Sequence, residues 1–328
     1  MRVVKLLLPS IAAIVSINLA VAQPNVAASI KPIHSLVSSV MEGVATPLLL
    51  VEAGSPHTYS LKPSQARYLQ EADAVFWVAH DVETFLEKPL ESIPKDTVVV
   101  EMGETEGLVE LSLREGGLFD SHGHDDHDDH KEHDDRKEHD DHKKHDDHAK
   151  HDDHGHDEHD PHFWLDPMNA KFMVREIQSR LSSIDPVNAA QYEVNAKKTE
   201  ARLDELLTEI EGELAGLQGS EFIAFHDAYQ YFENRFGVKA IGTVTVSPEV
   251  MPGAKRLKEL REKVKSSKAT CVFSEPQFEP RVVEVITDGT DARTGVLDPL
   301  GAELKSGTDL YPNLIRRMAK AFKDCLSS

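Results

Sequence analysis

The chain has 328 residues and a formal net charge of −21 at pH 7. More than half of that charge comes from residues 120–160, which hold 18 Asp and Glu against 6 Lys and Arg. Elsewhere no basic stripe is present that could neutralise phosphates, which argues against a nucleic-acid-binding protein, and the length predicts two domains rather than one.

The N-terminus has the pattern of a signal peptide. Two basic residues precede an apolar run over residues 6–22, which ends in the small residues Ala20-Val21-Ala22. We therefore expect a cleaved signal peptide over residues 1–22, since the run is too short and too interrupted to span a membrane. No cysteine stands near the cleavage site to carry a lipid, so the mature chain is expected free in a Gram-negative periplasm.

The part of the chain that follows alternates between short apolar runs and helical patterns. Helices are predicted over residues 63–71, where a proline occupies the first turn, and over residues 82–90. Strands that alternate with helices in this way predict βαβ units and a mostly parallel sheet covered on both faces. The expected strands are residues 26–30, 47–51, 74–78 and 97–100.

A low-complexity segment, residues 120–160, is called the His/Asp tract below. It repeats His-Asp-Asp-His and lacks apolar residues to bury, so we expect it to be disordered by itself. Imidazoles interleaved with carboxylates bind Zn²⁺, Cu²⁺ or Ni²⁺, but with modest affinity, because each site must order the chain as it forms. A solvated acidic loop without a role is the alternative, although solvation needs no histidines. The predicted low-affinity ligands are His122, His124, His127, His130, His133, His139, His142, His145, His148, His151, His154, His156 and His159.

Residues 186–217 predict one long amphipathic helix between the two halves of the chain. The segment has no internal proline, and its apolar residues recur three, four or seven positions apart. A helix over the whole range would be about 45 Å long. A stiff helix of this kind would restrict hinge opening more than a flexible linker would.

The alternation of strands and helices returns after Gly219. The two halves together predict an α/β protein with two lobes, each a mostly parallel sheet flanked by helices, joined by one long rigid helix. The expected boundaries are 23–185 for the N-terminal lobe, 186–217 for the linking helix and 218–328 for the C-terminal lobe. The predicted strands are residues 222–225, 238–246, 269–273 and 294–297, and the predicted helices are 227–235, 253–266, 279–287 and 310–325.

The only two cysteines are Cys271, in a predicted strand, and Cys325, in the last predicted helix. An exported protein meets an oxidising compartment, so we predict that they form a disulfide. The bridge would fix the C-terminal helix, and a loop of this length is worth about 4 kcal/mol in the chain-entropy model. Two buried free thiols are the alternative.

Five histidines lie outside the tract, and three of them are candidate metal ligands. His57 comes after the predicted strand 47–51, His226 directly follows the strand 222–225, and His162 follows the tract. Ligands of open α/β sheets bind beyond the carboxyl ends of the strands. We therefore expect His57 and His226 to face each other across a cleft between the lobes, with His162 closing the site.

Six segments, in order, resemble those of one known family. The family is that of the zinc-specific solute-binding proteins of bacterial ABC importers, the ZnuA-type members of metal-binding cluster 9 (A-I family). The resemblance covers nearly the whole mature chain and extends to an acidic His-rich loop and two cysteines in matching places. The segments are SPHTYSLKPSQ (55–65), HFWLDP (162–167), FHDAYQYFENRFG (225–237), SPEVMPGAKRL (247–257), CVFSEPQF (271–278) and LDPLG (297–301).

By this resemblance, the protein captures Zn²⁺ with high affinity in the periplasm and delivers it to an ABC-type membrane permease with its ATPase. It is expected to be a monomer and not an enzyme. His57, His162 and His226 match the three histidine ligands of the family. Some members add a glutamate just before the first ligand, but that position is Pro56 here. Water is therefore our first expectation for the fourth ligand, and Asp298, which matches an aspartate ligand of related manganese and zinc binders, is the second.

Three neutral imidazoles with water or one carboxylate favour Zn²⁺ over Mn²⁺, which prefers more oxygen ligands. Of the other histidines, His34 is expected to be structural, whereas His80 follows a strand end and could lie near the mouth of the site. Asp227 either accepts a hydrogen bond from a ligand imidazole or caps a helix.

Two other function classes fit parts of the pattern. Three histidines with an open fourth position also occur in zinc hydrolases, but the sequence has no HExxH motif and no nucleophile constellation. A periplasmic zinc buffer that acts through the tract alone is the second alternative. Loss of the tract would abolish binding by such a buffer, whereas an importer subunit would keep its tight site.

Overall fold

The computed structural model describes residues 23–114, 118–119, 159–245, 251–266 and 271–327. The predicted signal peptide and the tract histidines from His122 to His156 lie outside the described residues.

The N-terminal half of the described chain forms a parallel four-stranded sheet with the order β2-β1-β3-β4. Every residue of the first strand is buried, and its run of apolar and small residues shows no alternation of the kind that a half-exposed strand would have. Helices on both faces account for this pattern. The strands are β1 (Val26–Ile30), β2 (Leu48–Val51), β3 (Ala74–Trp77) and β4 (Val98–Glu101).

The C-terminal half repeats the arrangement, with a second parallel four-stranded sheet of order β6-β5-β7-β8. The two sheets therefore have the same topology, and the predicted fold class is confirmed. The strands are β5 (Glu221–Ala224), β6 (Lys239–Thr243), β7 (Cys271–Ser274) and β8 (Arg293–Val296).

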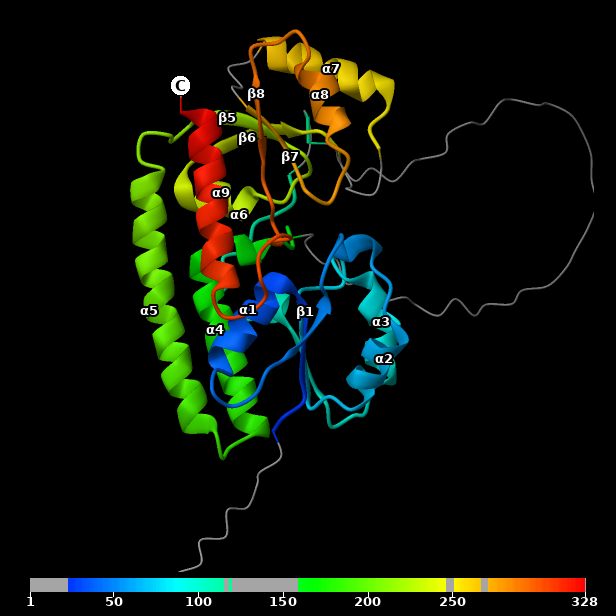
Figure 1. The fold of residues 1–328 in the computed structure, drawn as a ribbon, viewed down its shortest axis with the longest axis vertical. Helices are drawn as coiled ribbons and strands as arrows, with labels where there is room; N and C mark the ends of the chain where they lie inside the picture. The colour runs from blue at the N-terminus through cyan, green and yellow to red at the C-terminus, as the bar shows by residue number, and fades with distance from the viewer. Residues whose placement is uncertain (1–22, 115–117, 120–158, 246–250, 267–270, 328) are drawn as a thin grey trace, which may run out of the picture.

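The helices form one layer that runs along both sheets and two layers that each cover a single sheet (Figure 1). The shared layer contains α1 (Lys31–Val40), α4 (Pro167–Ile184), α5 (Ala189–Glu213) and α9 (Leu310–Leu326). On the opposite side, the N-terminal sheet is covered by α2 (Pro63–Gln70) and α3 (Glu87–Ser92), and the C-terminal sheet by α7 (Ala254–Ser266) and α8 (Arg281–Thr287). The short α6 (Gln230–Phe236) follows β5.

The hydrophobic core of the shared layer is continuous between the two halves. One cluster of buried residues extends from Val26 and Ile33 in the N-terminal half to Phe222 and Phe322 in the C-terminal half. Separate clusters lie under α7 and α8 and under α2 and α3. Because both sheets bury apolar surface against the same helices, a large rotation of one sheet against the other would expose part of this core.

Several predicted boundaries differ from the observed ones. The long helix α5 occupies Ala189–Glu213 and is shorter than the predicted range 186–217, and the strand predicted over 238–246 ends at Thr243. Residues 82–90 are not one helix: a 3-10 turn, η2 (Thr84–Leu86), precedes the short α3. Helices α1 and α4 were not predicted, although Pro167 at the start of α4 and the Asp166 side chain, which accepts a hydrogen bond from the Met168 amide, are helix-start signals.

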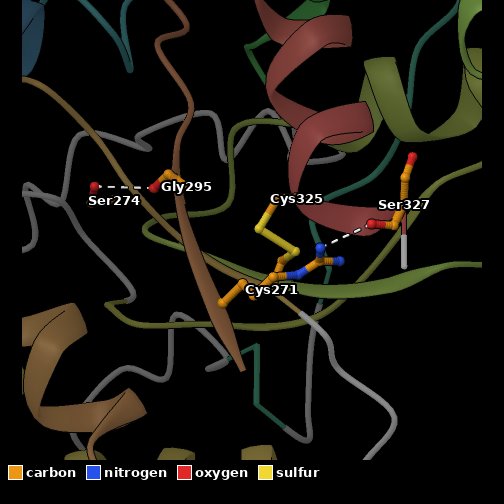
Figure 2. The surroundings of a disulfide bond; sticks show 6 residues. Cys271, Ser274, Gly295, Cys325 and Ser327 are labelled. Atoms are coloured by element: carbon orange, nitrogen blue, oxygen red, sulfur yellow. Dashed lines mark hydrogen bonds between the residues drawn. A yellow bond between two sulfur atoms is a disulfide. The ribbon is translucent and has the colours of Figure 1, made fainter. Parts of the chain in front are cut away.

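The predicted disulfide is present and joins β7 to α9 (Figure 2). The Cα atoms of Cys271 and Cys325 are 5.9 Å apart, and both residues are buried. Close by, the Arg293 side chain of β8 donates a hydrogen bond to the Ser327 carbonyl, which holds the end of α9 to the same sheet. Within the described residues, no helix is both long enough and apolar enough to cross a membrane.

Candidate metal centre

His57 reaches the region between the sheets from a turn that follows β2. The turn, η1 (Pro56–Thr58), begins on the buried Pro56, and Gly54 before it has a φ of 87°, a conformation that glycine adopts without strain. The His57 side chain is half-buried. Its place beyond the carboxyl end of β2 agrees with the sequence expectation.

His162 is held by its own chain neighbours and by the segment that leads into the tract. The Asp160 amide donates a hydrogen bond to the Leu111 carbonyl, and the Tyr231 hydroxyl donates one to the Asp160 carbonyl. The Asp160 carboxylate in turn accepts hydrogen bonds from the His162 amide at 2.9 Å and from the His162 Nδ1 at 2.8 Å. The second bond keeps the proton on Nδ1 and leaves Nε2 with a free lone pair.

His226 is fixed in the same way by a carboxylate from a different strand. It follows β5, and its Nδ1 donates a hydrogen bond at 2.7 Å to Oε1 of Glu275, which directly follows β7. Burial lowers the pKa of His226, but the charge and hydrogen bond of Glu275 outweigh burial, so the pKa of His226 is raised above its ordinary value. In the neutral ring the Nδ1 proton is held by Glu275, so the lone pair lies on Nε2, where a metal ion competes with a second proton for it.

The three histidines form a cluster with metal-ligating geometry. Each offers one ring nitrogen, and these nitrogens lie within 4.8 Å of one another. The ring centroids are 5.3 Å apart for His162 and His226, and 6.3 and 6.4 Å from His57 to those two rings. A tetrahedral zinc ion with bonds of about 2.0–2.1 Å separates its nitrogen ligands by roughly 3.4 Å, so small side-chain rotations suffice to close this set around an ion.

The space between the rings is small and mostly apolar. The cavity has a volume of about 20 Å³, enough for one ion or one water molecule. The ring centroids of Trp164 and His162 are 5.2 Å apart, and Nε1 of Trp164 donates a hydrogen bond to the Pro299 carbonyl. Pro299, Leu300 and Phe278 supply the remaining apolar wall.

Asp298 is placed outside this group of nitrogens. Its Oδ1 accepts hydrogen bonds from the Gln277 side chain and from the amides of Leu300 and Gly301, and its Oδ2 accepts one from the amide of Ala302. The carboxylate therefore fixes the loop that carries Pro299 and Leu300. Through this loop it positions Pro299 and Leu300 in the wall of the cavity.

The other candidate histidines lie away from the cavity. His34 is buried in α1, where its Nε2 bonds the Pro47 carbonyl and its Nδ1 bonds the Ser38 hydroxyl. His80 is exposed near Asp81 and Glu87. His159, the described tract histidine, is exposed, pairs with Glu110 and makes a β-bridge to Ser112.

Asp227, which follows His226, makes no hydrogen bond to a ligand ring within the described part of the chain. Its carboxylate is bound by the Arg114 guanidinium, which also forks to Glu233 of α6. The imidazole partners are instead Asp160 and Glu275, which the sequence analysis missed. Two signals were available: Asp160 stands two positions before His162, and Glu275 follows a predicted strand at the ligand-binding edge of the sheet.

Comparison with known proteins gives one consistent result. The family model of "ZnuA: Zinc-uptake complex component A periplasmic" matches residues 26–325. The chain is 55% identical over 313 residues to the high-affinity zinc uptake system protein ZnuA of Brucella suis, with 94% of each chain covered. It is 33% identical to the protein of the same name from Yersinia pestis, with 93% and 92% covered.

Solved structures agree in fold. A crystal structure of a ZnuA protein matches with a TM-score of 0.73 and 24% identity, covering 93% of this chain and 100% of that one. A mutant structure of the laminin-binding adhesin of Streptococcus agalactiae matches with a TM-score of 0.71 and 21% identity, with 93% and 100% covered.

Proposed function

The chain belongs to the family of ZnuA-type periplasmic zinc-uptake components, and on that premise we propose that it captures Zn²⁺ with His57, His162 and His226 and delivers it to an ABC importer. The observation that carries the proposal is the convergence of these three ring nitrogens, from chain segments far apart in sequence, within 4.8 Å of one another. Members of this family are solute-binding transport proteins and not enzymes, so the zinc ion is the substrate that is transported.

The donor set favours zinc. Three neutral imidazoles suit Zn²⁺, whereas Mn²⁺ prefers a site richer in oxygen. Water is our first choice for the fourth ligand, because the Asp298 carboxylate already accepts four hydrogen bonds from its surroundings. Asp298 as the fourth ligand would require that loop to rearrange.

Delivery requires a partner in the membrane. We propose that the loaded protein, as a monomer cleaved of residues 1–22, docks on the permease with the lobes 23–185 and 218–328 on either side of the ion and residues 186–217 linking them. ATP hydrolysis by the ATPase of the importer then drives release. We also propose that the His/Asp tract binds additional zinc weakly. Its last histidine, His159, lies three residues before the ligand His162.

A competition titration tests this function. Zn²⁺, Mn²⁺, Ni²⁺ and Cu²⁺ are titrated into the mature protein and into a variant that lacks residues 120–158. We expect one tight zinc site in both proteins, with Mn²⁺ bound much more weakly, and several weak sites in the full-length protein alone. If deletion of residues 120–158 abolished the tight site, the protein would be a zinc buffer that acts through the tract, and the importer proposal would be wrong.

A further inference from the structure

Two buried carboxylates stand directly behind two of the three proposed ligands. Asp160 and Glu275 are 2% and 3% exposed, and each accepts the Nδ1 proton of one imidazole, at 2.8 Å for His162 and 2.7 Å for His226. They come from different parts of the fold: Asp160 is the last residue of the tract, and Glu275 directly follows β7. Each is linked to the metal position through a single aromatic ring.

Neither carboxylate has a cationic side chain as partner among the described residues. Asp160 accepts hydrogen bonds from the neutral His162 ring and from the Gln230 side-chain amide, and Glu275 accepts one from the neutral His226 ring. Three other buried or partly buried carboxylates have arginine partners instead. Asp166 pairs with Arg235, while Asp227 and Glu233 share Arg114.

Two buried negative charges without cations are unfavourable unless a positive charge joins them. The cavity between the three rings is the place where that charge can sit. A divalent ion held by three neutral imidazoles carries two positive charges, which equal in number the negative charges of Asp160 and Glu275. Since both carboxylates and the rings of His162 and His226 are buried, this attraction would be screened much less than at the surface.

We propose that Asp160 and Glu275 set the charge of the metal site, so that a divalent cation is neutralised from behind the imidazoles and the fourth coordination position takes neutral water rather than an anion. This inference rests on the proposed function of the three histidines. It differs from a purely orienting role of the two carboxylates, because an uncharged acceptor of the same shape could orient a ring equally well.

Isosteric amides separate charge from orientation. Glu275→Gln and Asp160→Asn keep an oxygen that accepts the Nδ1 proton but remove one negative charge each. The zinc-loaded site of either variant then has an excess positive charge, and an anion such as chloride or thiocyanate neutralises it by replacing the fourth-position water. In a buffer whose only salt anion is the non-coordinating perchlorate, metal affinity falls by about 10- to 100-fold, the usual cost of changing a partner of a ligand imidazole.

Cobalt(II) reports this exchange, because its visible absorption changes when an anion enters its coordination sphere. The Co²⁺-loaded wild-type protein, Glu275→Gln and Asp160→Asn are titrated with thiocyanate at constant ionic strength, and zinc affinity is measured with chloride replaced stepwise by perchlorate. We expect the wild-type spectrum and affinity to stay constant, and both variants to show a new spectrum and a zinc affinity that rises with chloride. Glu110→Gln is the matched control, since Glu110 also pairs with a histidine but is 55% exposed and therefore screened by water.

The outcomes separate the two levels of the argument. A wild-type protein without a tight metal site would overturn the proposed function itself. Tight binding with a wild-type spectrum that shifts with thiocyanate would overturn the charge inference alone, and this measurement needs no variant to fold. Variants that bind metal without any response to anions would also overturn it, leaving the carboxylates with an orienting role.

Discussion

At the scale of single residues, the candidate site depends on where each imidazole holds its proton. Hydrogen bonds to Asp160 and Glu275 place that proton on Nδ1 of His162 and His226, and thereby direct Nε2 of both rings to the cavity. Rings that are already oriented lose little rotational freedom when an ion binds, which favours high affinity.

Replacement of the three cavity histidines tests their assignment. His57→Ala, His162→Ala and His226→Ala should each weaken the tight zinc site by more than about 100-fold, because a lost ligand costs more than a lost ligand partner. His34→Ala is the control, since His34 bonds the Pro47 carbonyl in α1 and should leave the affinity unchanged. Isothermal titration in competition with a chelator measures all four. Equal losses in the four variants would mean that the ligands are assigned wrongly.

His34 makes the apo protein sensitive to acid. Burial lowers its pKa below the ordinary 6.5, against a smaller opposing effect of the Pro47 hydrogen bond. The neutral ring is thus favoured in the folded state, so the stability it contributes is complete above pH 6.5 and is lost as the pH falls through the lowered pKa. His34→Gln keeps a hydrogen-bond donor for Pro47 but does not titrate.

The measurement is the free energy of unfolding of both apo proteins in urea at about pH 8 and about pH 5. Between these values the wild-type protein should lose more stability than His34→Gln. An equal loss would show that the ring is not held neutral by burial. The comparison between the two proteins cancels the titration of every other histidine.

At the scale of elements, the C-terminal helix α9 connects the parts of the fold. It packs on β8, α1 and α5, and the disulfide ties it to the inner strand β7. The loop that precedes it also meets the N-terminal half, where the Lys31 ammonium at the start of α1 donates to the carbonyls of Gly301, Ala302 and Leu304. The same loop contains Pro299 and Leu300 of the cavity wall.

Removal of the disulfide should lower stability without changing the site. The double variant Cys271→Ala/Cys325→Ala opens a loop of sequence separation 54, which costs about 4 kcal/mol in the chain-entropy model. Denaturant unfolding of the zinc-free protein measures this loss, and zinc affinity should stay within the error of the wild-type value. A reducing agent should destabilise the wild-type protein by a similar amount and leave the double variant unaffected. Destabilisation of the variant by reductant would contradict the role of this bond.

At the scale of the whole molecule, the two sheets share one helical layer and one core. Helices α5 and α9 contact each other and bury apolar residues in a cluster that includes strands of both sheets. The connection from β4 to β5 includes the two long helices α4 and α5, which pack against each other in the shared layer (Figure 1). Zinc capture is therefore expected to need local closure of side chains and little rotation of the lobes.

Small-angle scattering tests this expectation on the variant without residues 120–158. The apo and zinc-loaded scattering curves should superimpose within error, because rotation would expose the shared core. The intact protein serves as the comparison, since additional zinc bound by the tract would change its curve independently of the lobes. A marked decrease in radius of gyration of the deletion variant on zinc binding would contradict the expectation.

The sequence by itself determined the elements and their general order. Short apolar runs that alternate with helical patterns predicted two mostly parallel sheets covered by helices, and the positions of His57 and His226 beyond strand ends predicted their side of the sheets, because both signals are local in the chain. Helix α4 could also have been predicted from Asp166 and Pro167. Helix α1 could have been predicted as well, because Pro32 lies in its first turn and its polar residues recur three or four positions apart, at Lys31, His34, Ser35, Ser38 and Ser39.

Only the tertiary structure decided which side chains meet. Glu275 reaches His226 across 49 positions of sequence, and Asp298 bonds its own loop, although both follow strands at the same edge of one sheet. Which of two such carboxylates turns toward an imidazole depends on the packing of the loop and on the amides that compete for its oxygens. Those contacts arise between segments distant in the chain, and no periodicity in the sequence records them.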